Sequence, residues 1–289
     1  MQAYDKIKCT RKAGRATSLD YIHAIIRDFT EFHGDRRYGD DPALVGGVGF
    51  LAGIPVTVIG IEKGHSLTER IARDFGCVAP EGYRKALRLM HEAEKFRRPV
   101  ICFVDTQGAS CGKGAEERGE GEAIAENLYE MMTLKVPIIT VMVGEGSSGG
   151  ALALAVADEI WMLENAYFTV VSPEACASIL YKDSSRAPDA AEHLKLDAKS
   201  LLDLGIIEKV IAEPADFTDA EACAPFYDGI RKDLAYRLKH LAKVPTDTLL
   251  AERYEKYRKI GKCATEGAAA PAGSRRGLFR RRGLFRRRV

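Results

Sequence analysis

The residues best placed to do chemistry lie in a glycine-rich stretch, residues 144–154, which reads GEGSSGGALAL. It follows a continuous apolar run, residues 137–143 (PIITVMV), that is typical of a buried strand, and its later residues are small and typical of a helix. The first N–H groups of a helix have no partner inside it and lie at the positive end of its dipole. A turn of this kind can therefore hold negative charge, although its glycines would also serve close packing of helix on sheet.

Two kinds of chemistry fit this turn. Residues 146–150 match G-x-S-x-G, the nucleophile turn of α/β-hydrolases. Such an enzyme needs a histidine after a later strand, whereas the downstream histidines, His193 and His240, both lie in segments with a helical pattern. The alternative is an oxyanion hole, in which backbone N–H groups stabilise an enolate without any nucleophile. The pattern favours the oxyanion hole.

A second loop, residues 105–114 (DTQGASCGKG), follows the apolar run at 99–104. It resembles a phosphate-binding loop, but the spacing G-x-x-x-x-G-K-[ST] is one residue short and Gly114 replaces the Ser or Thr, which argues against an NTPase. Adjacent parallel strands bring the loops at their carboxyl ends to one edge of the sheet, where open α/β sheets bind ligands. We therefore expect both loops to form one site.

The elements that must position these loops alternate along the chain. Continuous apolar strands separated by helices predict a mostly parallel sheet covered on both faces, with a hairpin at its start. The later helices exceed what the sheet needs and would suit a subunit interface. Strands are expected at 44–51, 54–61, 99–104, 137–143, 159–163 and 167–171, and helices from Thr17 to about His33, from Pro80, and at 116–133, 149–157, 173–181, 186–204, 218–242 and 245–260.

Composition narrows the class of protein. The 289 residues are 46% hydrophobic and 29% charged, as in soluble globular proteins, and we expect a cytoplasmic protein without a signal peptide or membrane span. The seven cysteines form no C-x-x-C pair, which argues against a zinc ribbon and a disulfide framework, so no metal is expected. The net charge of +2 is misleading, because eight arginines fall in residues 275–289 and leave 35 basic against 41 acidic residues elsewhere. The body of the chain is therefore not expected to bind nucleic acid.

Three parts are expected along the chain. Residues 1–16 are polar and basic and are predicted to be disordered, and residues 17–260 form the folded domain with its C-terminal helices. Residues 261–289 form an arginine-rich tail that is either disordered or a contact for an anionic surface or partner.

Residues 144–174 resemble the crotonase superfamily, whose members stabilise enolates derived from acyl-CoA. Longer runs across residues 17–214 are similar to the carboxyltransferase alpha subunit of bacterial or plastid multi-subunit acetyl-CoA carboxylase. This resemblance implies an α/β, crotonase-like fold (a ββα spiral) with a helical C-terminal extension. The runs are HGDRRYGDD (33–41), VGGVGFLAGIPVTVIG (45–60), APEGYRKALRLM (79–90), GKGAEERGE (112–120), GEGSSGGALA (144–153) and SPEACASIL (172–180).

The resemblance implies transfer of a carboxyl group from N-carboxybiotin to acetyl-CoA, which gives malonyl-CoA in the first committed step of fatty acid synthesis. The biotin nitrogen removes the acetyl α-proton, so the protein needs oxyanion donors and no dedicated base. By position, the family's hole for the biotin oxyanion maps to the backbone N–H groups of Gly149, Gly150 and Ala151. The substrate-binding candidates are Gly108, Ala109, Lys63, Gly64 and Gly146.

The same resemblance implies partners. They are a carboxyltransferase beta subunit, which carries the zinc in many members and forms an α2β2 assembly, and a biotin carboxyl carrier protein that presents carboxybiotin. No tightly bound cofactor is expected on this chain. The alternative is a stand-alone crotonase-type hydratase or hydrolase acting on an acyl-CoA, with Glu145 or Glu174 as its catalytic carboxylate. A binding protein that lost activity is disfavoured by the intact glycine turn.

Overall fold

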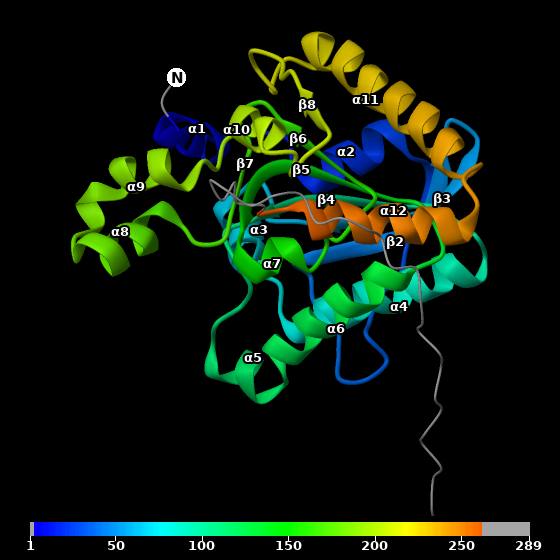
Figure 1. The fold of residues 1–289 in the computed structure, drawn as a ribbon, viewed down its shortest axis with the longest axis horizontal. Coiled ribbons are helices and arrows are strands. Elements are labelled where there is room, and N and C mark those ends of the chain that lie inside the picture. Colours follow the sequence, from blue (N-terminus) through cyan, green and yellow to red (C-terminus); the bar gives the residue numbers. More distant parts are fainter. Residues whose placement is uncertain (1–2, 262–289) are drawn as a thin grey trace, which may run out of the picture.

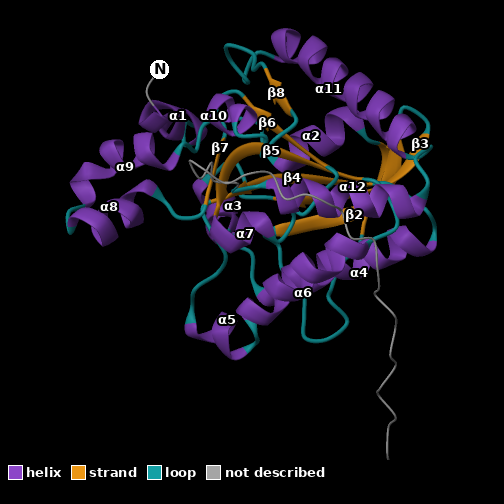
Figure 2. Cartoon of the chain, in the orientation of Figure 1, coloured by secondary structure: helices purple, strands orange, loops and turns teal. Residues whose placement is uncertain are grey.

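The computed structural model describes residues 3–261 and centres on an eight-stranded sheet. The strand order is β1-β2-β3-β4-β5-β6-β8, and β7 pairs with the end of β5 (Figures 1 and 2). Pairing is antiparallel from β1 to β3 and parallel from β3 onward. The strands are β1 (Arg27–Glu31), β2 (Leu44–Leu51), β3 (Ile54–Ile61), β4 (Val100–Thr106), β5 (Ile138–Ser147), β6 (Glu159–Leu163), β7 (Tyr167–Thr169) and β8 (Lys209–Ile211).

Helices cover both faces of this sheet. Figure 1 shows α4 and α6 on one face and α2 and α11 on the other, while α8 and α9 project from the body as a helical hairpin. In the part of the chain that the structure describes, no helix is both long and apolar enough to cross a membrane. The helices are α1 (Ala3–Thr10), α2 (Ser18–Ile25), α3 (Leu67–Ala72), α4 (Pro80–Lys95), α5 (Lys113–Glu117), α6 (Glu120–Thr133), α7 (Ser148–Leu152), α8 (Pro173–Tyr181), α9 (Ala187–Leu194), α10 (Ala198–Asp203), α11 (Ala220–Leu241) and α12 (Thr246–Lys259), with short 3-10 turns at Asp74–Gly76 and Ser184–Arg186.

The two central strands form the core of the molecule. Every residue of β4 and β5 is buried, which explains why both were readable as continuous apolar runs. The predicted hairpin of β2 and β3 is confirmed, and Ala52 and Gly53 form its turn with positive φ angles of 46° and 84°.

Some predicted boundaries are wrong. The helix expected from Thr17 to about His33 ends at Ile25, and Arg27–Glu31 form the edge strand β1 instead. The helix expected at 116–133 is divided at Gly119, whose φ of 84° starts a new helix at Glu120. The helix expected at 149–157 is only the short α7.

Residues 3–10 form helix α1, contrary to the disorder predicted for residues 1–16. Helix α1 buries Ile7 to 1% exposure, and the Ala3 N–H donates to Glu192 Oε1 at 2.8 Å. Lys6 Nζ donates to the Glu164 carbonyl at 2.9 Å. The polar composition of the segment was misleading because the partners that hold it, Glu164 and Glu192 among them, are remote in the sequence. From residue 262 onward, the predicted arginine-rich tail (261–289) lies outside the residues that the structure describes.

Helix α12 is held to the domain by Arg253, whose side chain is fully buried. Its guanidinium binds both carboxylate oxygens of Asp158 at 2.8 and 2.9 Å. It also donates to the carbonyls of Met131 in the last turn of α6 and of Leu134 and Val136 in the link to β5, at 2.7 to 2.9 Å. One side chain thus satisfies the orphan carbonyls at the end of α6 and joins three segments.

Candidate active site

The structure brings the two glycine-rich loops into direct contact. Strands β4 and β5 are parallel neighbours, and Thr106 lies opposite Gly146, so both loops leave the same edge of the sheet. A Cβ atom added at Gly150 would lie 2.6 Å from Ala109 N and 2.8 Å from Gly108 C. Only glycine fits at residue 150, because atoms do not approach a Cβ that closely.

Tyr83 of helix α4 holds the turn at Gly150 through a hydrogen bond. Tyr83 is fully buried, and its Oη donates to the Gly150 carbonyl at 3.1 Å. Burial raises the pKa of this hydroxyl well above its ordinary value, so it remains a hydrogen-bond donor at neutral pH. This role of Tyr83 was not predicted from the sequence. The available signal was its hydroxyl, which needs a partner when buried.

The loop after β4 is held by its own side chain. Thr106 Oγ1 accepts from the Gly108 N–H at 3.0 Å and donates to the Gly108 carbonyl at 2.7 Å. The φ of 151° at Gly108 is a conformation that side chains disfavour, and an added Cβ there would meet open space. Gly108 and Ala109 therefore present their backbone beside Gly150 with no side chain from Gly108 in the way.

The turn into α7 starts with a serine in the left-handed region. Ser148 has a φ of 58°, and it is exposed. Gly149, Gly150 and Ala151 follow in the first turn of α7, where N–H groups lack partners inside the helix. The preceding Ser147 is buried and donates to Tyr167 Oη at 3.2 Å. The histidines that a hydrolase would need, His193 and His240, lie in helices α9 and α11.

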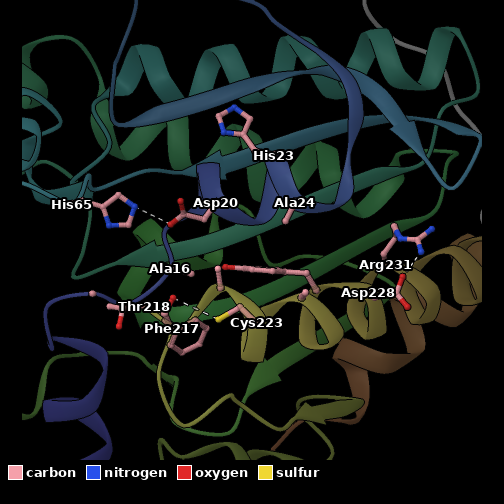
Figure 3. A pocket seen from close by; sticks show the side chains of 14 residues that line it. Ala16, Asp20, His23, Ala24, His65, Phe217, Thr218, Cys223, Asp228 and Arg231 are labelled. Atoms are coloured by element: carbon pink, nitrogen blue, oxygen red, sulfur yellow. Dashed lines mark hydrogen bonds and ion pairs between the residues drawn. The ribbon is translucent and has the colours of Figure 1, made fainter.

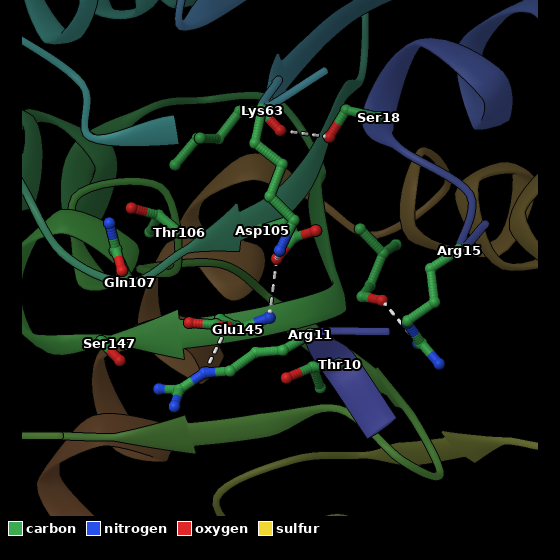
Figure 4. Close-up of polar contacts among 12 residues, drawn as sticks. Thr10, Arg11, Arg15, Ser18, Lys63, Asp105, Thr106, Gln107, Glu145 and Ser147 are labelled. Atoms are coloured by element: carbon green, nitrogen blue, oxygen red, sulfur yellow. Dashed lines mark hydrogen bonds and ion pairs between the residues drawn. The ribbon is translucent and has the colours of Figure 1, made fainter. Parts of the chain in front are cut away.

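Lys63 and Asp105 form a buried ion pair beside this edge (Figure 4). The distance from Lys63 Nζ to Asp105 Oδ1 is 2.7 Å, and the Glu145 N–H donates to the same oxygen at 2.8 Å. Gly144 must be glycine, because a Cβ there would lie 2.3 Å from Asp105 Oδ1. The predicted substrate-binding Lys63 thus has its ammonium engaged by a protein carboxylate, and sequence analysis missed Asp105.

The remaining candidates have structural neighbours of their own. The Gly64 N–H donates to Glu62 Oε1 at 2.6 Å, and its φ is 78°. A Cβ at Gly146 would lie 2.8 Å from the Tyr167 carbonyl, so this glycine lets β7 pair with β5. The structure therefore brings Gly108, Ala109 and Gly150 together, and the catalytic and substrate-binding roles of all the candidates stay predictions.

A cavity of about 160 Å³ opens between the N-terminal segment and the ends of β4 and β5. Basic side chains outnumber acidic ones around it. Arg15 lies at its edge, binds Glu213 through two hydrogen bonds of 2.8 Å, and donates to the Val143 carbonyl (Figure 4). Its lining residues are Thr10, Arg11, Lys12, Arg15, Ala16, Thr17, Lys63, Arg70, Phe75, Asp105, Gln107 and Glu145.

A larger cavity of about 670 Å³ lies between α2 and α11 (Figure 3). Its wall includes the ion pair between His65 Nε2 and Asp20 Oδ2, at 2.9 Å, and the thiol of Cys223. None of the predicted site residues lines it. The glycine loops, rather than this cavity, carry the candidate site.

Arg11 links the N-terminal segment to the site. Its Nε lies 2.9 Å from Glu145 Oε1 and its Nη1 lies 3.0 Å from Glu174 Oε1, while Tyr167 Oη donates to Glu145 Oε2 at 3.1 Å. One guanidinium therefore joins strand β5 to the start of the projecting helix α8.

We expect Arg11→Gln to loosen helix α8 without unfolding the domain. The Arg11 side chain is 41% exposed, so the loss in unfolding free energy should stay within about 1 kcal/mol. Limited proteolysis should cut the α8–α9 hairpin faster in the variant. Lys12→Gln is the matched control, because Lys12 makes no ion pair among the described residues. Equal cutting rates for the two variants would contradict the tether.

Comparison with known proteins decides the family. Residues 1–261 match the family described as acetyl co-enzyme A carboxylase carboxyltransferase-like. The chain belongs to this carboxyltransferase family. It is 55% identical over 262 residues to the acetyl-coenzyme A carboxylase carboxyl transferase subunit alpha of Ruminiclostridium cellulolyticum, covering 90% of this chain and 98% of the relative. The family membership predicted from the sequence is confirmed, and the relatives support the carboxyltransferase and not the hydratase alternative.

A second carboxyltransferase relative joins two subunits in one chain. The "subunits beta/alpha" protein of Natranaerobius thermophilus is 57% identical over 259 residues, which cover 90% of this chain. This chain spans only 43% of that relative.

Solved structures of carboxyltransferases share the fold. Transcarboxylase 12S superimposes with a TM-score of 0.64 at 20% identity, covering 82% of this chain and 43% of the other. A Pseudomonas malonate decarboxylase hetero-tetramer in complex with coenzyme A gives a TM-score of 0.62 at 20% identity, covering 77% and 88%. The predicted crotonase-like α/β fold is thereby confirmed.

Proposed function

We propose that this chain is the alpha half of an acetyl-CoA carboxylase carboxyltransferase, which moves a carboxyl group from N-carboxybiotin on a carrier protein to acetyl-CoA. The observation that carries the proposal is the contact between Gly150 and the backbone of Gly108 and Ala109, held in place by Tyr83. An oxyanion hole requires backbone N–H groups that reach one point without intervening side chains, and we infer that these two segments supply them.

The proposed reaction uses these N–H groups when carboxybiotin breaks down. When the N–C bond of carboxybiotin breaks, CO₂ leaves and the ureido oxygen becomes negative. The N–H groups of Gly149, Gly150 and Ala151 stabilise that oxygen, aided by the dipole at the start of α7. The biotin nitrogen then takes the α-proton of acetyl-CoA, and the resulting enolate carbon bonds to CO₂. Biotin thus gains the proton and acetyl-CoA gains the carboxyl group, so the protein supplies no base.

The carboxylates that a stand-alone hydratase would use are already engaged. Arg11 binds both Glu145 and Glu174, and Tyr167 donates a further hydrogen bond to Glu145. To act on a substrate, either carboxylate would first have to give up its ion pair with Arg11. This arrangement supports the carboxyltransferase over the hydratase or hydrolase.

The partners are part of the proposal. A relative that joins beta and alpha subunits in one chain supports a beta partner for this chain, and the α2β2 stoichiometry, the zinc on the beta subunit and the biotin carrier are inferred with it. No group of three or more metal-ligating side chains occurs within residues 3–261. We propose that carboxybiotin is bound as a substrate and that the enzyme works in the cytoplasm.

The proposal predicts activity only in a mixed complex. We would measure malonyl-CoA-dependent carboxylation of free biotin, the reverse half-reaction, with the chain alone and with a zinc-bearing beta subunit. Activity should appear in the mixture and not with either chain alone, because each subunit supplies one of the two oxyanion holes. An inactive mixture, together with hydration or hydrolysis of an acyl-CoA by this chain alone, would replace the proposal with the stand-alone enzyme.

A further inference from the structure

Glu120 is a buried carboxyl group without a hydrogen-bond partner. It is the first residue of helix α6 and is 4% exposed. Both of its carboxyl oxygens are buried, and neither has a partner among the described residues. Buried carboxylates are normally paired or bonded, because loss of water strongly disfavours the charged form. An unpaired carboxyl group in such a place is therefore expected to be neutral.

The surroundings of Glu120 strengthen this conclusion. Burial, followed by the negative charges of Asp41, Glu81 and Glu116, raises the pKa of Glu120 to about 8, while Arg118 acts in the opposite direction. Arg118 is occupied by Glu81, to which it donates at 2.9 and 3.2 Å. The first turn of a helix favours negative charge, but here burial and the neighbouring acids outweigh that effect.

The other cations nearby are also engaged. Arg84 binds Asp35 Oδ2 at 2.8 Å and Lys85 binds Asp40 Oδ1 at 2.5 Å, while Asp41 accepts the N–H groups of Ala43 and Ala79. Arg84, Lys85 and Arg118 thus each already have an acidic partner other than Glu120.

Glu120 and Tyr83 lie on helices α6 and α4, which pack against each other, and Arg118, two residues before Glu120, binds Glu81, two residues before Tyr83. After burial, the Glu120 carboxylate is the largest influence that raises the pKa of the Tyr83 hydroxyl. That hydroxyl has one proton, and it donates it to the Gly150 carbonyl. An ionised carboxylate is a stronger acceptor than a carbonyl, so an ionised Glu120 would compete with Gly150 for this proton.

We propose that Glu120 is a positioning residue, which keeps the Tyr83–Gly150 hydrogen bond only while its carboxyl group is protonated. Loss of its proton to solvent at alkaline pH releases the Gly150 carbonyl and disturbs the turn above it. The inference rests on the proposed function for its effect on catalysis. Its physical basis, a neutral buried carboxyl group, does not depend on that function.

The first test is the pH profile of Glu120→Gln. Glutamine has the shape of the neutral acid and cannot ionise, so the variant should keep wild-type kcat at pH 7. At pH 9 the wild type should be about tenfold less active than the variant, because roughly a tenth of Glu120 then remains protonated. We would compare kcat of the reverse half-reaction in the complex with the beta subunit. The ratio of the variant's kcat to the wild-type kcat removes any pH dependence that comes from the substrates, because both proteins are assayed with the same substrates.

Glu122→Gln is the matched control, since Glu122 lies two residues after Glu120 on the same helix and is exposed. Its profile should follow that of the wild type. A purely structural role for Glu120 would change stability and leave the kcat ratio flat across pH. Parallel profiles for Glu120→Gln and wild type would therefore overturn the positioning role.

Two further measurements need no activity. The wild-type infrared spectrum at pH 7 should contain the carbonyl band of a protonated carboxylic acid that Glu120→Gln lacks. The folded state holds this proton more tightly than the unfolded chain, so wild-type stability falls as pH rises toward 8. The variant's advantage in Tm should grow between about pH 5 and 8 and then stay constant. Without that band the proposal fails, whatever the enzyme assay shows.

Discussion

Gly150→Ala is expected to reduce kcat for carboxyl transfer by about 100-fold or more, the effect of losing one oxyanion donor. The single added carbon would lie 2.6 Å from Ala109 N, 2.8 Å from Gly108 C and 3.0 Å from Tyr83 Oη. Two of these atoms belong to the backbone, so the loop after β4 must retreat and cannot simply change a rotamer. The N–H group of residue 150 is kept, but its direction relative to that loop changes.

The measurement is kcat of the reverse half-reaction in the presence of the beta subunit. Overpacking alone should cost about 1–3 kcal/mol, so circular dichroism must show that the variant is folded at the assay temperature. Gly229→Ala is the control, because a Cβ at Gly229 in helix α11 meets nothing within 4 Å. If Gly150→Ala is folded and has wild-type kcat, the contact of Gly150 with Gly108 and Ala109 is not needed for catalysis.

Arg253→Met is expected to lower the unfolding free energy by about 3–5 kcal/mol. The arginine is fully buried, and its loss leaves the Asp158 carboxylate without its cation and three carbonyls without their donor. Methionine replaces much of the volume, so the cost arises mainly from the unpaired polar groups.

Urea unfolding of the wild type and the variant would measure this difference. Arg258→Met on the same helix is the control, since Arg258 is exposed, and it should change stability by less than about 0.5 kcal/mol. Equal losses for the two variants would mean that α12 contributes little through Arg253.

The central part of the fold was predictable because its signals are local. Strands β4 and β5 are buried on both faces and therefore read as unbroken apolar runs. Strand β1 was missed because only β2 pairs with it and nearly all its residues are exposed, so its sequence, RDFTE, carries no apolar alternation. Helix α1 was missed because the partners that hold it to the domain, Glu164 and Glu192, are remote in the sequence.

The candidate site was predictable in its backbone and not in its side chains. Glycine reports directly on close approach, and Gly150 and Gly108 do meet across two loops. Tyr83 sits within an apolar stripe, where nothing in the spacing reveals that its hydroxyl reaches Gly150. The pairing of Lys63 with Asp105 depends on two strands being neighbours, which only the three-dimensional arrangement shows.

The distant partners of helix α1 have a consequence for synthesis of the chain on the ribosome. Ala3 and Glu192 are 189 residues apart, and at about 5–20 residues per second that interval takes roughly 10–40 s. Until then α1 cannot complete its contacts, because helix α9 has not yet been made. Docking of α1 is therefore a late step in folding, and the nascent segment is a natural client for a chaperone that binds short apolar stretches.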